Sequence, residues 1–329
     1  MRILPSAALI LAAAVLPAVA QQQNPYLGAW NLTGTGQDSA NVYWLEIKDT
    51  GGTLSGMFLN RTSSPFALAV VKIENGELVF QGGKPGAPTG PEYRAKFEGG
   101  KLIGSHTVTQ RPQTPDPAAT PTQRTVNWIG VRPPTWPDVN ANGKHTFGTP
   151  VTLYDGKTLD GWVGQNANRP LSWSIVDGAA INTPSGNNLV SKEKFKDFKI
   201  EAEYKLAPKG NSGIYLRGRY ELQLYDDLGG DPNTQPQHKH MAIYGRTPAS
   251  TQASKPAGEW QQMEAIIVGN RVTVTLNGTR VHDNAVIQGI TGGALDNDEL
   301  APGPILIQGD HEQVWVRKVV VTPITGVGK

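Results

Sequence analysis

The sequence predicts an all-β protein of two domains, and three observations lead to this prediction. The chain has 329 residues, and at roughly 150 residues per domain this length suggests two domains. Its 38 glycines and 25 prolines exceed the usual share of these residues, which indicates many turns and little helix. Short apolar runs that alternate with polar residues recur along most of the chain, as in half-buried antiparallel strands.

The first domain is predicted over residues 24–131 as a small antiparallel β-barrel or sandwich. Runs such as YWLEIK, TLSGMFL and GELVF are separated by glycine-rich turns, including DTGG and ENG. Asn-Gly and Gly-Gly pairs between alternating runs are typical of β-hairpins. Residues 132–148, RPPTWPDVNANGKHTFG, lack apolar periodicity and are rich in proline, which predicts a linker.

The second domain is predicted over residues 149–324, again from strand patterns. DFKIEAEYKL places its apolar residues on one face and its Lys and Glu residues on the other, as expected for a half-buried strand. RVTVTLNGTRVHD consists of two such runs joined by Asn277-Gly278, the strongest short hairpin signal. At least seven strands with almost no helical periodicity predict two packed antiparallel sheets or a barrel.

The first twenty residues, MRILPSAALILAAAVLPAVA, have the pattern of a secretory signal peptide. One arginine precedes an apolar run, which ends in the small-x-small pattern Ala18-Val19-Ala20. We expect cleavage after Ala20 and export to the periplasm or the outside of the cell. The apolar run is too short to span a bilayer comfortably, so we expect no membrane anchor once it is removed.

The composition gives no indication of binding to nucleic acid. Lys and Arg number 30 against 28 acidic residues, and the net charge of +2 is not gathered into a basic run. The chain contains no cysteine, so we expect core burial rather than disulfides to hold the fold together.

One predicted strand carries an unusual row of polar side chains. In NSGIYLRGRYELQLYD, residues 211–226, one parity is apolar and should face the core. Side chains two apart on a strand lie about 6.6 Å apart, so the opposite row spans one or two sugar rings. That row would contain Tyr215, Arg217, Arg219, Glu221, Gln223 and Tyr225.

Nearby segments would add further polar groups if their strands adjoin this one. KHMAIYG contributes His240 and Tyr244, and PILIQGDHE contributes Gln308 and His311. Amides, carboxylates and an aromatic ring on one concave surface are typical of a carbohydrate site. An ordinary solvated face with weak ion pairs is the alternative.

Several motifs follow one another through the second domain: LYDGKTLDGW, NSGIYLRG, YELQLYD, AIYG and ILIQGDHEQVWVRKVVV. In this order, and over about residues 149–324, they resemble the 3-keto-disaccharide hydrolase family. The resemblance implies a fold similar to the concanavalin-A-like lectins and glucanases, a two-sheet antiparallel jelly roll. It also implies a secreted or periplasmic enzyme that cleaves glycosides or disaccharides whose glucose unit carries a 3-ketone.

A 3-ketone suggests the chemistry and the residues that would perform it. The ketone acidifies the hydrogen at C2, so the glycoside can be cleaved by C2 proton abstraction and elimination, with water adding afterwards, or by hydrolysis. This needs a base, a group that stabilises the enolate oxygen and an acid. We expect Glu221 or His240 as the base and Arg217 at the enolate. The expected substrate-binding residues are Tyr215, Arg219, Gln223, Tyr244, Gln308 and His311, of which His311 is also a candidate acid.

A divalent metal is an alternative way to stabilise the enolate. His238 and His240 are two residues apart, and Glu221 or His311 could supply a third ligand. Polar loop histidines are more common than metal ligands, so the divalent metal is kept as an alternative and is not the main expectation.

Two other kinds of protein would fit the same pattern. A non-catalytic carbohydrate-binding module is the main alternative, because the same fold serves lectins. A scaffolding protein that binds a partner through exposed strand edges is the third reading.

Overall fold

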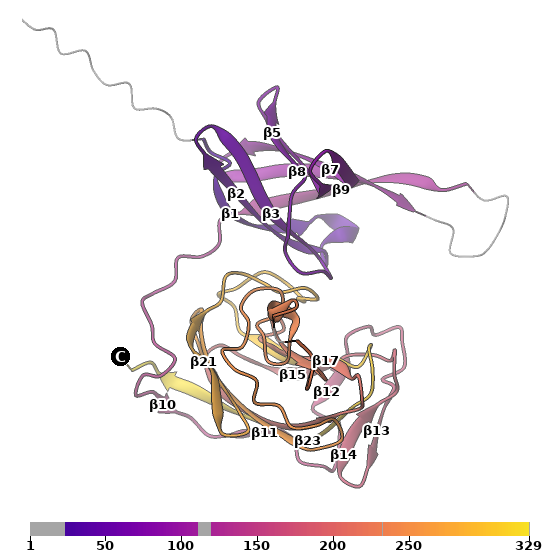
Figure 1. Ribbon diagram of the computed structural model, residues 1–329, viewed down its shortest axis with the longest axis vertical. Coiled ribbons are helices and arrows are strands. Elements are labelled where there is room, and N and C mark those ends of the chain that lie inside the picture. The colour runs from indigo at the N-terminus through magenta and orange to yellow at the C-terminus, as the bar shows by residue number, and fades with distance from the viewer. Residues whose placement is uncertain (1–23, 111–119, 232, 329) are drawn as a thin grey trace, which may run out of the picture.

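The computed structural model describes residues 24–110, 120–231 and 233–328, and these residues form β-strands and loops (Figure 1). Within these ranges the helical elements are two short 3-10 turns, η1 (Gly36–Asp38) and η2 (Pro236–His238). The predicted all-β fold is therefore confirmed. No helix in the described part of the chain has the length and apolar character needed to cross a membrane. The predicted signal peptide, residues 1–20, lies outside the described residues.

The N-terminal domain is one nine-stranded antiparallel sheet in the order β4-β3-β2-β1-β9-β8-β7-β6-β5. Contacts of β3 with β5 and of β4 with β6 bring its two ends together, so the sheet curls into a barrel. Stacked, tilted and edge-to-face rings of Phe58, Phe80, Tyr93 and Trp128 fill the interior. The strands are β1 (Gly28–Gly34), β2 (Val42–Thr50), β3 (Thr53–Asn60), β4 (Phe66–Ala67), β5 (Val70–Glu74), β6 (Glu77–Lys84), β7 (Ala87–Glu98), β8 (Lys101–Gln110) and β9 (Thr122–Val131).

The C-terminal domain is a sandwich of two antiparallel sheets, as predicted. The back sheet runs in the order β13 (Trp173–Val176), β14 (Ala179–Asn182), β23 (Val314–Gly326), β16 (Phe198–Leu206), β19 (Gln261–Val268), β20 (Arg271–Leu276) and β21 (Thr279–Val286). Two further strands, β10 (Thr146–Phe147) and β11 (Val151–Tyr154), pair with β23. The front sheet runs in the order β12 (Trp162–Gly164), β15 (Leu189–Phe195), β22 (Gly303–Ile307), β17 (Asn211–Leu216) and β18 (Tyr220–Tyr225).

The apolar faces of these two sheets enclose the main core. Strand β16 alternates as its sequence predicted: Phe198, Ile200 and Tyr204 are fully buried, while the intervening Lys and Glu residues are partly exposed. Ile214, Leu222 and Ile305 enter the same core from the front sheet. The other face of the front sheet is thereby left for polar side chains.

The prediction of one continuous strand over residues 211–226 is wrong. The segment is a hairpin in which β17 and β18 pair antiparallel, with Leu216 opposite Tyr220. Arg217 and Gly218 turn the chain in the left-handed region, with φ of 56° and 65°. The turn breaks the expected polar row into two strands, and it places Tyr215 directly opposite Glu221.

Two other segments also differ from their predictions. KHMAIYG forms turns instead of a strand, but it still lies along β18, through an isolated bridge between Ile243 and Leu222 and three backbone hydrogen bonds with Glu221 and Gln223. Strand β10 lies inside the segment predicted as a linker, where it extends the back sheet by pairing with β23. The end of the predicted linker thus pairs with the second domain before β11, the first strand of the predicted second domain, begins.

Candidate active site

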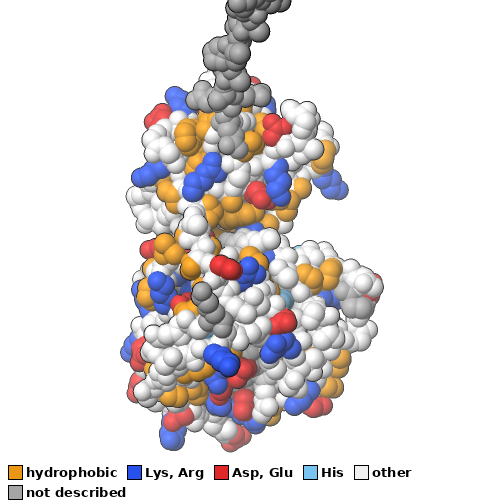
Figure 2. Space-filling view, turned by 90° about the vertical axis from the view of Figure 1, so that its left-hand side faces the viewer, with side chains coloured by type: hydrophobic (Ala, Val, Ile, Leu, Met, Phe, Trp, Pro, Cys, Tyr) orange, Lys and Arg blue, Asp and Glu red, His pale blue; other side chains and the backbone are white. Residues whose placement is uncertain are grey.

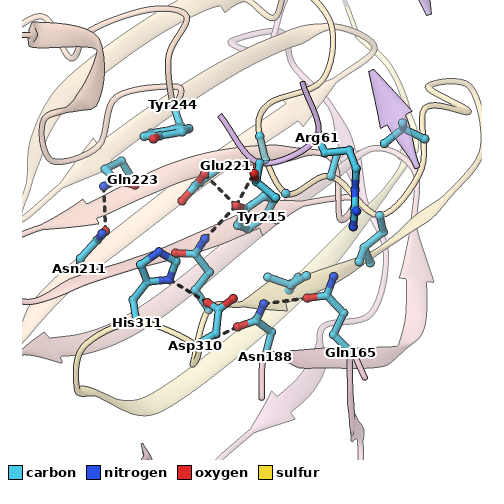
Figure 3. Close-up of a pocket in the computed structure, with 18 of the residues that line it drawn as sticks. Arg61, Gln165, Asn188, Asn211, Tyr215, Glu221, Gln223, Tyr244, Asp310 and His311 are labelled. Atoms are coloured by element: carbon cyan, nitrogen blue, oxygen red, sulfur yellow. Dashed lines mark hydrogen bonds and ion pairs between the residues drawn. The ribbon is translucent and has the colours of Figure 1, made fainter. Parts of the chain in front are cut away.

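A cavity of about 600 Å³ lies over the polar face of the front sheet, a volume typical of small-molecule sites. Each of the five front strands brings a polar side chain to it (Figure 3). Tyr215 lies in β17 and Glu221 in β18, Gln165 directly follows β12, and Asn188 directly precedes β15. Gln308 directly follows β22. The face that the core leaves free is therefore the floor of the cavity.

Glu221 is the acidic group at the centre of this floor. Its side chain is 2% exposed, and its Oε2 lies 2.8 Å from the hydroxyl of Tyr215. The absence of a side chain at Gly213 makes room for the carboxyl group, since a Cβ there would lie 2.3 Å from Glu221 Oε1. The backbone N–H of Glu221 donates to Thr291 Oγ1 at 2.9 Å, which fixes the residue from a second side.

The hydrogen-bond pattern around Glu221 favours its protonated form. The Tyr215 hydroxyl lies 2.8 Å from Glu221 Oε2 and 2.9 Å from the carbonyl oxygen of Gly292, yet it has a single proton to donate. A protonated Glu221 can donate to Tyr215 while Tyr215 donates to Gly292, so that both contacts are satisfied. Burial raises the pKa of Glu221 to about 8, although the hydrogen bond with Tyr215 acts against the rise. At neutral pH this carboxyl group is therefore an acid.

A second titratable unit, the pair Asp310 and His311, lines the same cavity. His311 Nδ1 lies 2.8 Å from Asp310 Oδ1, and this hydrogen bond raises the pKa of His311. Burial is the largest influence on Asp310 and opposes its ionisation, but the hydrogen bond and charge of His311, together with hydrogen bonds from Asn188 and the backbone, outweigh burial and lower the pKa of that carboxyl. Because Asp310 engages Nδ1, the lone pair of a neutral His311 is on Nε2.

Amide side chains fix the surroundings of these two units. Asn188 Oδ1 accepts the backbone N–H groups of Gly309 at 2.7 Å and Asp310 at 3.1 Å, which holds the segment after β22. Asn188 Nδ2 donates to Gln165 Oε1 at 2.7 Å, and Gln308 Nε2 donates to the Tyr215 hydroxyl at 3.0 Å. The cavity is thus lined by oriented donors and acceptors around one buried acid.

At the far end of the cavity, Gln223 donates from Nε2 to Asn211 Oδ1 at 3.0 Å, and Tyr244 presents its ring (Figure 3). An aromatic ring beside planar amides suits the alternating apolar and hydroxyl surfaces of a sugar. The structure thus brings six predicted site residues to one cavity, namely Tyr215, Glu221, Gln223, Tyr244, Gln308 and His311.

Arg217 lies outside this group, so the prediction that it joins the other polar residues on one concave surface is wrong. Its side chain is 1% exposed and extends toward the segment between β15 and β16. There it donates to the carbonyl oxygens of Lys196 and Gly269 and to Asp197 Oδ1, the last at 2.8 Å. The left-handed turn at Arg217 removes its side chain from the parity of Tyr215. We therefore assign Arg217 to the structure of the hairpin end.

Arg219 is displaced from the cavity by the same turn. Its Nε donates to Asp296 Oδ1 at 2.5 Å and its Nη1 to the carbonyl oxygen of Ala301 at 2.9 Å. It does not line the cavity. Its place is to hold the loop that precedes β22 against the hairpin.

His240 is also misplaced by the prediction, because it lies inside the sandwich. Its Nε2 is 2.7 Å from the hydroxyl of Tyr204, which belongs to the back sheet, and its Nδ1 is 2.8 Å from the carbonyl oxygen of Tyr225. Burial lowers the pKa of His240. A side chain between the sheets cannot reach a ligand on the polar face of the front sheet.

The two metal-ligand candidates point to different partners. His238 Nε2 lies 2.6 Å from Ser64 Oγ of the N-terminal domain, whereas His240 contacts Tyr204. Over residues 24–110, 120–231 and 233–328, no three His, Asp or Glu side chains are grouped as a metal site would require. The divalent metal stays a prediction for which these histidines give no support.

Four polar residues that the second domain contributes to the cavity were not predicted from the sequence: Gln165, Asn188, Asn211 and Asp310. Each lies at or just beyond the end of a front strand, where alternation no longer indicates which way a side chain points. Asp310 stands beside the predicted His311 in the motif QGDHE, and an Asp next to a candidate catalytic His was a usable signal.

Comparison with protein-family models matches residues 149–322 to the 3-keto-alpha-glucoside-1,2-lyase-like domain. The match covers more than half of the chain. The chain belongs to this family. The family resemblance of the motifs is thereby confirmed, together with the general class, a glycoside-acting enzyme. All the cavity residues named above lie within the matched segment.

A curated relative agrees with this membership. The 3-keto-disaccharide hydrolase of Bacteroides thetaiotaomicron is 30% identical over 154 residues, which cover 36% of this chain and 52% of the relative. The chain thus spans about half the length of that curated relative. A solved structure from Parabacteroides distasonis, described as a candidate glycosyl hydrolase, is 25% identical with a TM-score of 0.47 and covers 59% of this chain and 94% of that chain.

A more distant solved structure is the carbohydrate-binding module CBM66 from Bacillus subtilis. It is 12% identical with a TM-score of 0.31 and covers 50% of this chain and 92% of that chain. Since both TM-scores are below 0.5, the family membership rests on the sequence match.

Proposed function

We propose that the protein is an exported enzyme that cleaves 3-keto-glycosides, including 3-keto-disaccharides. The observation that carries the proposal is a buried acid, Glu221, and an imidazole held by a carboxylate, His311 with Asp310, in one sugar-sized cavity. Family membership and the relative's name, 3-keto-disaccharide hydrolase, support the same substrate class.

The protonation states of these groups suggest how they divide the work. Neutral His311 removes the proton from C2, which the 3-ketone has acidified, and the electron pair forms an enolate. The enolate then collapses to a C1–C2 double bond as the C1–O bond breaks, and Glu221 gives its proton to the departing oxygen. Water adds across the double bond, with hydroxyl at C1 and hydrogen at C2, so the net reaction is hydrolysis.

This assignment reverses the roles expected from the sequence. There, Glu221 was a candidate base and His311 a candidate acid, whereas here His311 is the base and Glu221 the acid. The reason is the environment of each group: burial keeps a proton on Glu221 at neutral pH, while Asp310 orients His311 and increases its basicity. Gln308 donates to the Tyr215 hydroxyl on the cavity floor, and its amide is our candidate donor to the enolate oxygen.

The direct test is turnover of a synthetic 3-keto-glucoside with a chromogenic aglycone. We expect the purified protein to release the aglycone, and to leave the unoxidised glucoside intact. Repeating the assay with a chelator, and then with added divalent ions, tests the metal alternative. Binding of glycosides measured by calorimetry, without product from the 3-keto substrate, would contradict the enzyme and support a carbohydrate-binding module.

Export is tested separately, by expression in a Gram-negative host followed by fractionation. We expect periplasmic or secreted protein whose mass corresponds to loss of residues 1–20, as the signal pattern predicts. Cytoplasmic protein that retains these residues would contradict export.

The pH dependence of kcat/KM is expected to be bell-shaped with a narrow maximum. Activity should fall at low pH as His311 becomes protonated, with a midpoint above the ordinary value of 6.5 because its pKa is raised. It should fall again above a pH of about 8 as Glu221 loses its proton. Rates measured from pH 5 to 10 check this, and activity that keeps rising above pH 9 would show that Glu221 works as a base instead.

Gly213→Ala is expected to reduce kcat/KM about 10- to 100-fold. The new methyl group would overlap Glu221 Oε1 and must displace the carboxyl, and small misplacements of a catalytic group have effects of this size. Gly161→Ala is the matched control, because a Cβ there meets its nearest atom at 3.7 Å. Wild-type activity in Gly213→Ala would show that the position of Glu221 is not critical.

A further inference from the structure

The N-terminal domain supplies part of the wall of the cavity. Four of the residues that line it, Ala40, Val42, Arg61 and Thr62, come from this domain. The family match begins at residue 149, so this wall is outside the segment that the family shares. It faces the floor formed by the front sheet, so a ligand on the floor is covered by the N-terminal domain.

The segment between β3 and β4 that carries Arg61 is fixed against the second domain. The backbone N–H of Gly293 donates to the carbonyl oxygen of Arg61 at 2.6 Å. Ser64 Oγ lies 2.6 Å from His238 Nε2. Gly292 packs so closely that a Cβ there would lie 2.6 Å from the carbonyl oxygen of Ser63. The wall is thus held at the same loop that contacts Tyr215.

A wider interface keeps the two domains in this arrangement, and Figure 2 shows the outer surface along which the two lobes meet. Val42, Trp44 and Leu59 form one buried cluster with Ile290 of the second domain. The guanidinium of Arg246 lies 4.1 Å from the centre of the Trp44 ring. In the same interface Asn31 Nδ2 donates to Glu299 Oε1 at 2.8 Å. Apolar burial combined with buried polar contacts indicates a defined orientation rather than a flexible tether.

Arg61 is the one Lys or Arg among the described residues that line the cavity. Figure 3 shows its guanidinium directed toward Gln165, apart from the end where Gln223 and Tyr244 lie. A guanidinium offers five N–H donors in a planar fork, which suits pairs of sugar hydroxyls. We propose that Arg61 determines specificity by binding the sugar that leaves, that is, the second ring of a 3-keto-disaccharide.

This inference rests on the proposed function and adds which part of the substrate Arg61 recognises. The oxidised ring must lie at Glu221 and His311, where the reaction takes place. Both of these residues lie in the family segment, whereas Arg61 lies outside it. A group from outside the shared segment is suited to what differs between substrates, the leaving sugar, rather than to the common reaction at C1 to C3.

The test compares two substrates in the full-length protein: a methyl 3-keto-glucoside and a 3-keto-disaccharide. For Arg61→Gln we expect kcat/KM to fall at least about tenfold on the disaccharide, mainly through KM, and less than threefold on the methyl glycoside. A hydrogen bond to a charged group has about this worth. Arg61→Lys keeps the charge without the fork and should lose an intermediate amount on the disaccharide. Arg94→Gln, an arginine of the same domain outside the cavity, should match wild type on both.

The outcomes separate this inference from the function on which it rests. Wild-type protein that cleaves neither substrate overturns the proposed function. Wild-type protein that cleaves both, with Arg61→Gln unchanged on the disaccharide or equally impaired on both, overturns the role of Arg61 alone. An unchanged melting temperature in Arg61→Gln shows that a selective loss is not caused by unfolding.

Discussion

Glu221→Gln should lower kcat/KM on a 3-keto-glucoside by at least about 100-fold, the loss expected on removing a general acid. The amide has the shape of the carboxylic acid and can still donate to Tyr215, so the contacts of the cavity floor are retained. What it lacks is a proton that it can transfer to the departing oxygen. The measurement is steady-state kinetics at the pH optimum, together with circular dichroism to show that the fold is unchanged.

Glu193→Gln is the matched control for this experiment. Glu193 is an exposed glutamate of β15 in the same front sheet, and it does not line the cavity, so its variant should retain wild-type rates. A Glu221→Gln variant with more than a tenth of wild-type activity would contradict the assignment of Glu221 as the acid. A substrate with a good leaving group, such as a nitrophenol, should be less affected than an alkyl glycoside, since it needs less help from an acid.

Arg217→Ala should destabilise the protein by about 3–5 kcal/mol, the usual cost of removing one partner of a buried ion pair. The substitution leaves Asp197 without its cation and two carbonyl oxygens without donors at a site that is 1% exposed. Denaturant unfolding followed by tryptophan fluorescence measures the change in the free energy of unfolding. The expected effect is on stability, since Arg217 lies away from the cavity.

Two further variants separate a structural Arg217 from a catalytic one. Arg280→Ala removes an arginine that is 55% exposed and should change stability by no more than about 0.5 kcal/mol. Arg217→Lys keeps a charge near Asp197, and under conditions where it is folded its kcat/KM should be within threefold of wild type. A 100-fold loss in a folded Arg217→Lys protein would return Arg217 to the catalytic machinery.

The sheets could be predicted from sequence because one face of each strand is buried. In β16, Phe198, Ile200 and Tyr204 alternate with charged residues because one face of the strand packs on the core and the other faces solvent. At Asn277-Gly278 both residues have positive φ, 50° and 82°, as the predicted two-residue turn requires. Local chemistry decides such features, so they can be read without knowing the rest of the fold.

Which residues line the cavity depends on contacts between distant parts of the chain, and a local sequence pattern does not reveal these contacts. Arg217-Gly218 turns the chain inside an apparently continuous alternating run, and a single unrecognised turn moved both Arg217 and Arg219 away from the floor. His240 is buried by Tyr204, which lies 36 residues earlier in the chain. Arg61 reaches the cavity from another domain. These positions follow from how the sheets and domains pack together. That packing cannot be predicted from local sequence patterns.

A single amide plane between Gly292 and Gly293 joins the reaction centre to the neighbouring barrel. Its carbonyl oxygen accepts from the Tyr215 hydroxyl, while its N–H donates to the carbonyl oxygen of Arg61. Hydrogen bonds in series polarise one another. Removing the N-terminal domain should therefore weaken the hydrogen bond from the Tyr215 hydroxyl to the carbonyl oxygen of Gly292, and so change how readily Glu221 releases its proton. We therefore expect the pKa of Glu221 to depend on whether the N-terminal domain is in place.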